Sequence, residues 1–169
     1  RMRRQARNHG IRGNISYAIA AADCALWDLK ARILETPLAA LLDPVRPSVK
    51  VYGSGGFTSY SIKRLQQQLA GWIEQGIDAV KMKVGRQPDR DLDRVRAARK
   101  AIGPEPDLYV DANGAYTVKQ ALWFAEAYAE EGVTWFEEPV TSDDFAGLRL
   151  LRERAPARVR ISAGEYCFE

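Results

Sequence analysis

The sequence predicts an α/β protein in which a helical segment precedes a partial (β/α)8 TIM-type barrel of about five strands. After residue 48, short runs of β-prone residues alternate with amphipathic helical stretches at the spacing of a βα unit. Repeated βα units predict a parallel sheet covered by helices. A pair of lysines on one face of the second strand then favours a barrel over an open sheet, because unpaired polar groups are costly in a sheet that is covered on both faces.

Two helices are expected before the first strand. Apolar residues recur at helical spacing over residues 15–33, and Asn14 stands where the N-cap of that helix is expected. A second, short helix is predicted with Thr36 as its N-cap and Pro37 in its first turn, ending at Leu42.

Five strands are expected after a domain boundary at residues 44–48, where Asp43-Pro44 ends the short helix. Glycines 76, 103 and 132 stand where the first three intervening helices should end, a common use of glycine. The predicted strands are 51–57, 79–84, 108–111, 134–138 and 159–165.

The second strand reads VKMKV and carries the two lysines. Lys81 and Lys83 share one face of this strand, while Val80, Met82 and Val84 share the other. Two lysines inside a sheet require a polar cavity, and a (β/α)8 barrel has one at the carboxyl ends of its strands, where active sites lie. The structural alternative is that both lysines extend to solvent or pair with acids.

Three successive strands end in carboxylates. They are Asp111 in LYVDANG, Glu137 in WFEEPV and Glu165 in ISAGEY. Neighbouring parallel strands lie about 4.8 Å apart, so three acids at equivalent heights would repel one another unless a cation lies among them. Oxygen ligands suit Mg2+, with Mn2+ as the near alternative, and the lack of histidine or cysteine nearby argues against zinc. Alternatively, one or more of these acids caps the following helix or faces solvent.

A lysine beside such a cation has a possible catalytic task. Desolvation and neighbouring positive charge lower the pKa of a lysine, although nearby carboxylates oppose this change. The sequence therefore predicts a lysine whose amine can be neutral, and can accept a proton, near pH 7. A base beside a divalent cation can remove the proton α to a carboxylate, because the cation binds the carboxylate oxygens and stabilises the enediolate that forms.

Four motifs follow one another along the chain: VKMKVG, VDANGAY, FEEPV and AGEY. In this order they resemble the enolase superfamily, and within it the mandelate racemase/muconate lactonizing enzyme-like family. The resemblance is closest to the mandelate racemase-like branch of that family. The helix AAADCALWDLKARI and the following TPLAALL are similar to the end of that family's N-terminal capping domain. The resemblance therefore implies that residues 1–47 are the C-terminal helical part of a capping domain. Residues 48–169 would be the first half of a (β/α)8 barrel.

The resemblance also implies roles for individual residues. Lys83 would be the general base, while Lys81 would tune Lys83 and bind the substrate carboxylate, and Asn113 would line the substrate pocket. Glu138 follows a ligand by one residue, so its side chain is expected on the opposite face and outside the ligand set. The implied metal ligands are Asp111, Glu137 and Glu165. A glutamate as the third ligand favours the racemase and acid-sugar dehydratase branch over the muconate-lactonizing branch.

The activity implied is Mg2+-dependent abstraction of the α-proton of a small carboxylate or sugar-acid substrate to a metal-stabilised enediolate, and we expect a sugar-acid dehydratase in the full-length parent. One alternative is a racemase, an epimerase or a cycloisomerase of the muconate-lactonizing type, with a lysine on a sixth strand. Another is a non-catalytic fragment that serves as an assembly module, which should bind no Mg2+.

The chain is expected to be a fragment of a longer protein. A full barrel has about 250 residues, and the histidine–aspartate pair that this branch carries on later strands is missing, since the one histidine is His9. Unpaired strand edges predict a homo-oligomer, or association with the missing half of the barrel in the parent chain.

Composition excludes several other classes of function. The net charge of +3 comes from five arginines near the N-terminus, and no aromatic residues interleave them to stack bases, so no nucleic-acid partner is expected. No membrane span or signal peptide is recognisable, which predicts a cytoplasmic protein. Cys24 and Cys167 are expected to be small buried residues. The glycine-rich YGSGGFTSY lacks a phosphate-binding pattern and predicts a close-packed first strand.

Overall fold

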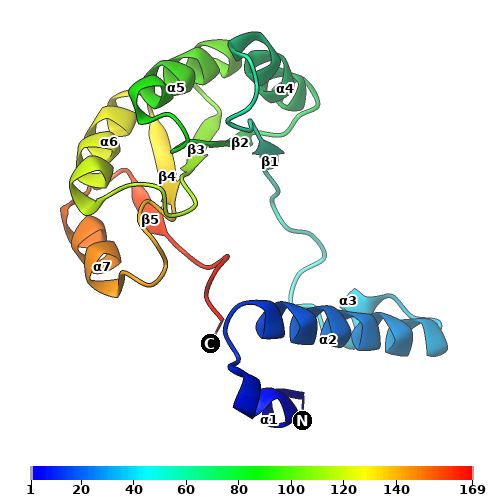
Figure 1. Ribbon diagram of the computed structural model, residues 1–169. Coiled ribbons are helices and arrows are strands. Elements are labelled where there is room, and N and C mark those ends of the chain that lie inside the picture. Colours follow the sequence, from blue (N-terminus) through cyan, green and yellow to red (C-terminus); the bar gives the residue numbers. More distant parts are fainter. Residues whose placement is uncertain (1, 169) are drawn as a thin grey trace. The chain divides into compact units, whose positions relative to one another are not determined.

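The computed structural model describes residues 2–168, which divide into two compact units (Figure 1). Residues 51–165 form the larger unit, and residues 2–50 with 166–168 form the smaller one. Within these residues, no helix combines the length and the apolar character needed to span a bilayer.

The larger unit is a parallel sheet with helices on one side. Its strands follow the order β1-β2-β3-β4-β5, and every neighbouring pair is parallel. Figure 1 shows helices α4 to α7 along one face of this sheet. The five strands of the predicted partial barrel are therefore present, and a helix follows each of the first four. The elements are β1 (Gly53–Gly55), α4 (Ile62–Glu74), β2 (Ala79–Lys83), α5 (Pro88–Ile102), β3 (Asp107–Asp111), α6 (Val118–Glu130), β4 (Val133–Glu137), α7 (Phe145–Arg154) and β5 (Arg160–Ser162).

The first and last strands are shorter than the sequence predicts. The structure gives 53–55 where 51–57 was expected, and 160–162 where 159–165 was expected. Both strands lie at the edges of the described sheet and pair on one side only, so fewer ladder hydrogen bonds extend them. The three inner strands agree with the prediction to within one residue at each end.

The core lies between the sheet and its helices. Alternate strand residues point to this side, and helices α4 to α7 supply the other half of the packing. Side chains of the core that are fully buried include those of Val80, Met82, Leu108, Val110, Phe136, Leu65, Leu69, Val95 and Leu151.

The glycine-rich first strand is packed closely against α4, as expected. A Cβ atom on Gly53 would collide with the Trp72 ring, and one on Gly55 would lie 2.5 Å from the Gln68 side chain. The Gln68 amide oxygen accepts a 2.8 Å hydrogen bond from the Gly56 backbone N–H. These glycines therefore allow a helix to approach the strand. The three glycines that were predicted to end helices, at positions 76, 103 and 132, all have positive φ.

The smaller unit is helical, with two differences at the predicted caps. Asn14 is the first residue of α2 instead of its N-cap, because Gly13 occupies the cap position. Thr36 does not cap α3, since the extended backbone of Pro37 makes that residue the N-cap. The elements are α1 (Met2–Ala6), the 3-10 helix η1 (Arg7–His9), α2 (Asn14–Ile33) and α3 (Leu38–Leu41).

The two cysteines are exposed, so the prediction that they are buried is wrong. Cys24 lies on α2, where Ala31 alone among the 20 residues is buried and Leu26 is 58% exposed. Within this unit α2 packs against the short helices α1 and α3, which cover little of its surface.

Candidate active site and metal centre

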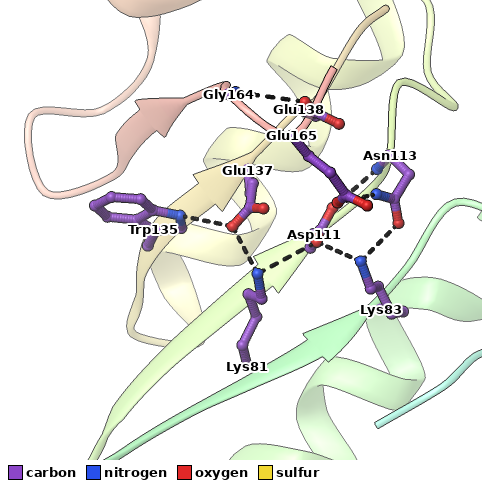
Figure 2. Close-up of polar contacts among 9 residues, drawn as sticks. All are labelled: Lys81, Lys83, Asp111, Asn113, Trp135, Glu137, Glu138, Gly164 and Glu165. Atoms are coloured by element: carbon purple, nitrogen blue, oxygen red, sulfur yellow. Dashed lines mark hydrogen bonds and ion pairs between the residues drawn. The ribbon is translucent and has the colours of Figure 1, made fainter. Parts of the chain in front are cut away.

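Three carboxylates converge at the carboxyl ends of the strands (Figure 2). Asp111 and Glu137 are the last residues of β3 and β4 and face each other in register. Glu165 lies three residues beyond the end of β5, in the following loop. One carboxylate oxygen from each of the three residues lies within 4.8 Å of the others. These three residues are called the acidic trio below.

The third acid joins the trio from a loop, which differs from the expectation that all three end strands at equivalent heights. Ser162 is the β5 residue in register with Glu137. The strand pairing ends there, and the chain turns so that Glu165 reaches back to the site. Glu165 is accordingly exposed, while Asp111 is completely buried.

Lys81 extends from β2 into the space between two of the acids. Its Nζ donates to Glu137 Oε2 at 2.7 Å and lies 3.4 Å from Asp111 Oδ2. Burial alone would lower the pKa of Lys81, but the hydrogen bond and the negative charge of Glu137, together with the charge of Asp111, raise it above its ordinary value. For Lys81 the expectation of a lowered pKa is therefore wrong, because the carboxylates that oppose the shift are in direct contact with the ammonium group.

Lys83, two residues later, points toward the same cluster. Its Nζ donates to Asp111 Oδ2 at 2.5 Å and to Asn113 Oδ1 at 2.8 Å, and 22% of its side chain is exposed. Asn113 also donates from its backbone N–H to Asp111 Oδ1 at 3.0 Å and from Nδ2 to Glu165 Oε2 at 3.2 Å. Asn113 thus links the lysine to two members of the acidic trio.

The charges of the cluster do not balance. Three carboxylates face two ammonium groups, and Asp111 and Glu137 lie where water cannot fully solvate them. Both lysines pair with acids, as the structural alternative proposed, and the same contacts place their amines beside the trio. A hard cation with oxygen ligands would relieve the remaining repulsion among the three acids. The donor set therefore fits Mg2+ or Mn2+.

Aromatic side chains next to the cluster were missed by the sequence analysis. The indole N–H of Trp135 donates to Glu137 Oε2 at 3.4 Å, and its ring lies 5.9 Å from the ring of Tyr109. Tyr109 in turn contacts Tyr52, whose ring centroid is 5.3 Å from Lys81 Nζ. Trp135 is two residues before Glu137, so the alternation that pairs the lysines would also have placed it on this face.

Glu138 lies outside the acidic trio. Its side chain is buried, its backbone has a φ of 42°, and its Oε1 accepts a 3.4 Å hydrogen bond from the Gly164 N–H. Its backbone carbonyl accepts a 2.7 Å bond from the Gly114 N–H. Glu138 thus holds together the loops that carry Asn113 and Glu165.

Two family models match the chain. Residues 64–169 match an enolase C-terminal domain-like family, and residues 2–43 match the N-terminal domain of mandelate racemase and muconate lactonizing enzyme. Together these matches cover most of both structural units.

Curated proteins similar to the chain include lyases and isomerases. A 3,6-anhydro-alpha-L-galactonate cycloisomerase from Streptomyces coelicolor is 42% identical over 144 residues, which are 83% of this chain and 40% of that protein. An arabinonate dehydratase from Saccharolobus solfataricus is 31% identical over 137 residues, 79% of this chain and 37% of the dehydratase. The chain thus spans about two fifths of the length of these relatives.

Solved structures give the same picture. A mandelate racemase/muconate lactonizing enzyme-like protein from Rubrobacter xylanophilus superposes with a TM-score of 0.91 at 59% identity, over 96% of this chain and 45% of that one. A racemase from Streptomyces coelicolor A3(2) with bound magnesium superposes with a TM-score of 0.85 at 38% identity, over 98% and 46%.

Proposed function

Because this chain belongs to the mandelate racemase/muconate lactonizing enzyme-like family of the enolase superfamily, we propose that it carries the metal-binding and proton-abstracting part of an enzyme acting on small carboxylic acids. Asp111, Glu137 and Glu165 hold a divalent cation, and Lys83 removes the α-proton of the substrate. The observation that carries the proposal is the convergence of the acidic trio beside Lys83.

The two structural units have separate parts in this proposal. Residues 1–47 form the C-terminal helical part of a capping domain, and residues 48–169 form the first half of a (β/α)8 barrel. The match of residues 2–43 to the family's N-terminal domain supports the first assignment, and the five parallel strands with their four connecting helices support the second.

The cation proposed for the trio is Mg2+, as in the similar racemase structure, with Mn2+ as the alternative. When bound, such an ion neutralises the carboxylate of a substrate and the negative charge that develops as the α-proton leaves. The trio fits this ion because all three side chains offer oxygen atoms and no nitrogen or sulfur ligand.

The side chains of this chain supply the remaining steps. Lys83 Nζ lies on the inner face of the sheet, 22% of the side chain is open to solvent, and Asn113 holds the amine by a 2.8 Å hydrogen bond. A substrate carboxylate that enters beside the trio also meets Lys81, which is cationic and can donate to it. Lys81 binds and orients the substrate, and Lys83 accepts the proton.

Sugar acids are the substrate class that we propose, and dehydration is the reaction. Relatives named arabinonate dehydratase, L-talarate/galactarate dehydratase and L-rhamnonate dehydratase support this assignment. Cycloisomerisation of a sugar-acid derivative is the second candidate, favoured by relatives named 3,6-anhydro-alpha-L-galactonate cycloisomerase, at 42% identity, and D-galactarolactone cycloisomerase, at 33%. Both reactions begin with the same removal of a proton next to a carboxyl carbon.

Substitution of Lys83 tests the proposal. In D2O with Mg2+ and galactarate as the probe, the wild-type chain should exchange the α-proton of the probe, and Lys83→Ala should abolish this exchange. The affinity for Mg2+, measured by calorimetry, should not fall, because the deleted ammonium group competes for Asp111. Lys100→Ala removes an exposed lysine from α5 and should exchange at the wild-type rate.

Three results would each contradict a separate part of the proposal. Persistent exchange in Lys83→Ala removes this lysine from the mechanism, and no exchange in the wild-type chain removes the catalytic assignment. A calorimetric titration without a Mg2+ site removes the metal centre.

A further inference from the structure

Helix α5 carries two buried charged residues that do not touch the acidic trio. Asp91 is 1% exposed and Arg94 is 7% exposed, and both lie toward the amino end of the helix. Burying charged groups is costly unless they are hydrogen-bonded, so their partners show what the burial accomplishes. Those partners are the loops at the carboxyl ends of three successive strands.

Arg94 bonds the loop that follows β1. Its guanidinium donates to the carbonyl oxygens of Tyr60 at 2.9 Å, Phe57 at 3.0 Å and Gly56 at 3.3 Å. The Gly56 carbonyl also accepts a 3.2 Å hydrogen bond from the backbone N–H of Lys83. Arg94 is therefore one shared carbonyl away from the backbone of the proposed base.

Asp91 bonds the loops that follow β2 and β3. Its Oδ2 accepts from the Gly85 N–H at 2.7 Å, two residues after Lys83. The same oxygen accepts from the Tyr116 hydroxyl at 2.7 Å, three residues after Asn113. One buried carboxylate thus fixes the chain directly after the base and the chain that carries its hydrogen-bonding partner.

We propose that Asp91 and Arg94 are positioning residues, which hold Lys83 and Asn113 in place relative to the acidic trio through the loops after β1, β2 and β3. Neither side chain contacts the trio, so they act through the backbone. As a claim about catalysis this inference rests on the proposed function, but the loop positions themselves can be tested without it.

The same helix offers a matched control at its other end. Arg99 makes four hydrogen bonds to carbonyl oxygens, those of Pro106, Gly103, Glu131 and Gly132, at 2.8, 2.9, 2.9 and 3.0 Å. These carbonyls precede β3 and β4, at the end of the sheet away from the acidic trio. Arg99→Lys therefore removes a similar set of bonds without touching the loops of the site.

The experiment compares Arg94→Lys with Arg99→Lys by NMR in the absence of metal and substrate. In Arg94→Lys, the Tyr60 amide, which bonds the Phe57 carbonyl, should exchange with solvent about tenfold faster or more, since the charge-assisted bonds that hold its loop are lost. The signals of the Lys83 ε-methylene group and the Asn113 carboxamide should shift. In Arg99→Lys these signals should keep their wild-type positions even if the variant unfolds at a lower urea concentration.

A second pair of variants covers the case in which Arg94→Lys does not fold. Tyr116→Phe deletes the hydroxyl that bonds Asp91, and Tyr128→Phe deletes a buried hydroxyl 3.0 Å from that of Tyr116 but outside the loops. The Asn113 carboxamide signal should shift in Tyr116→Phe and stay in place in Tyr128→Phe.

Equal shifts in the test variants and their controls, or unmoved Lys83 and Asn113 signals in the test variants, would overturn the inference. Because the signals are recorded without substrate, this outcome is independent of whether Lys83 catalyses proton exchange. In a chain that does exchange the α-proton of galactarate, Arg94→Lys should lower the rate at saturating galactarate more than it raises KM, and Arg99→Lys should change neither.

Discussion

Gly56 gives the sharpest test of how the first strand fits against the rest of the sheet. A Cβ atom at this position would lie 2.6 Å from Cβ and 2.9 Å from Cα of Met82, and 3.0 Å from Cδ1 of Leu65. The Gly56 backbone also has a φ of 57°, which costs an L-residue about 1–2 kcal/mol. Overpacking a well-filled core costs about 1–3 kcal/mol more. We therefore expect Gly56→Ala to lower the free energy of unfolding by about 2–5 kcal/mol.

Gly71→Ala is the matched control for this substitution. Gly71 lies inside α4, and apart from its two chain neighbours and the nearby backbone of the same helix, no atom lies within 4 Å of the position that its Cβ would occupy. Alanine is the better helix former, so this variant should gain about 0.5–1 kcal/mol. Urea unfolding followed by circular dichroism measures both changes. A Gly56→Ala variant as stable as the wild type, or a destabilised Gly71→Ala, would refute the reasoning about close packing at β1.

Three further predictions concern single side chains. Tb3+ bound by the acidic trio should give emission that is sensitised by excitation of Trp135, because the indole contacts the ligand Glu137, and Trp135→Phe should largely remove this emission. Unchanged emission at equal Tb3+ occupancy would contradict a cation at the trio. Burial raises the pKa of Tyr128, so the folded state keeps a proton that the unfolded state releases above about pH 10. The contribution of this one tyrosine to the free energy of unfolding should therefore fall there by up to about 1.4 kcal/mol per pH unit. Urea midpoints at pH 9 and 11 should show a smaller loss in Tyr128→Phe and the full loss in the exposed control Tyr17→Phe. Thr117→Ala removes a capping box and should cost about 1 kcal/mol by urea unfolding, and a neutral result would mean that the cap is not formed in solution.

The inner strands could be predicted because their residues carry two signals at once. In β2, alternation of lysines with Val80 and Met82 marks a strand with one polar and one apolar face, and a glycine after each of α4, α5 and α6 marks where the chain turns back. The edge strands have weaker signals, because glycine dominates the first and pairing on one side limits both. The exposure of Cys24 could not be predicted, since an apolar face on a helix does not say whether another element covers it.

The candidate site could be predicted in part. Lys81, Lys83, Asp111 and Glu137 lie on strands, where alternation and register determine their direction. Glu165 lies in a loop, and its place beside the others depends on backbone turns that periodicity does not encode. The raised pKa of Lys81 likewise depends on contacts with Glu137 and Asp111 that form only when three strands lie side by side.

Alternation along β2 also explains how the fold protects the site against errors of register. Val80 and Met82 fill the fully buried core against the helices, while Lys81 and Lys83 face the acids from the other side of the same strand. A shift of one residue would exchange the two sets, placing lysines among apolar side chains and leaving the carboxylates without their ammonium partners. Both changes are strongly unfavourable, so the hydrophobic core enforces the strand register that places Lys83 beside Asp111.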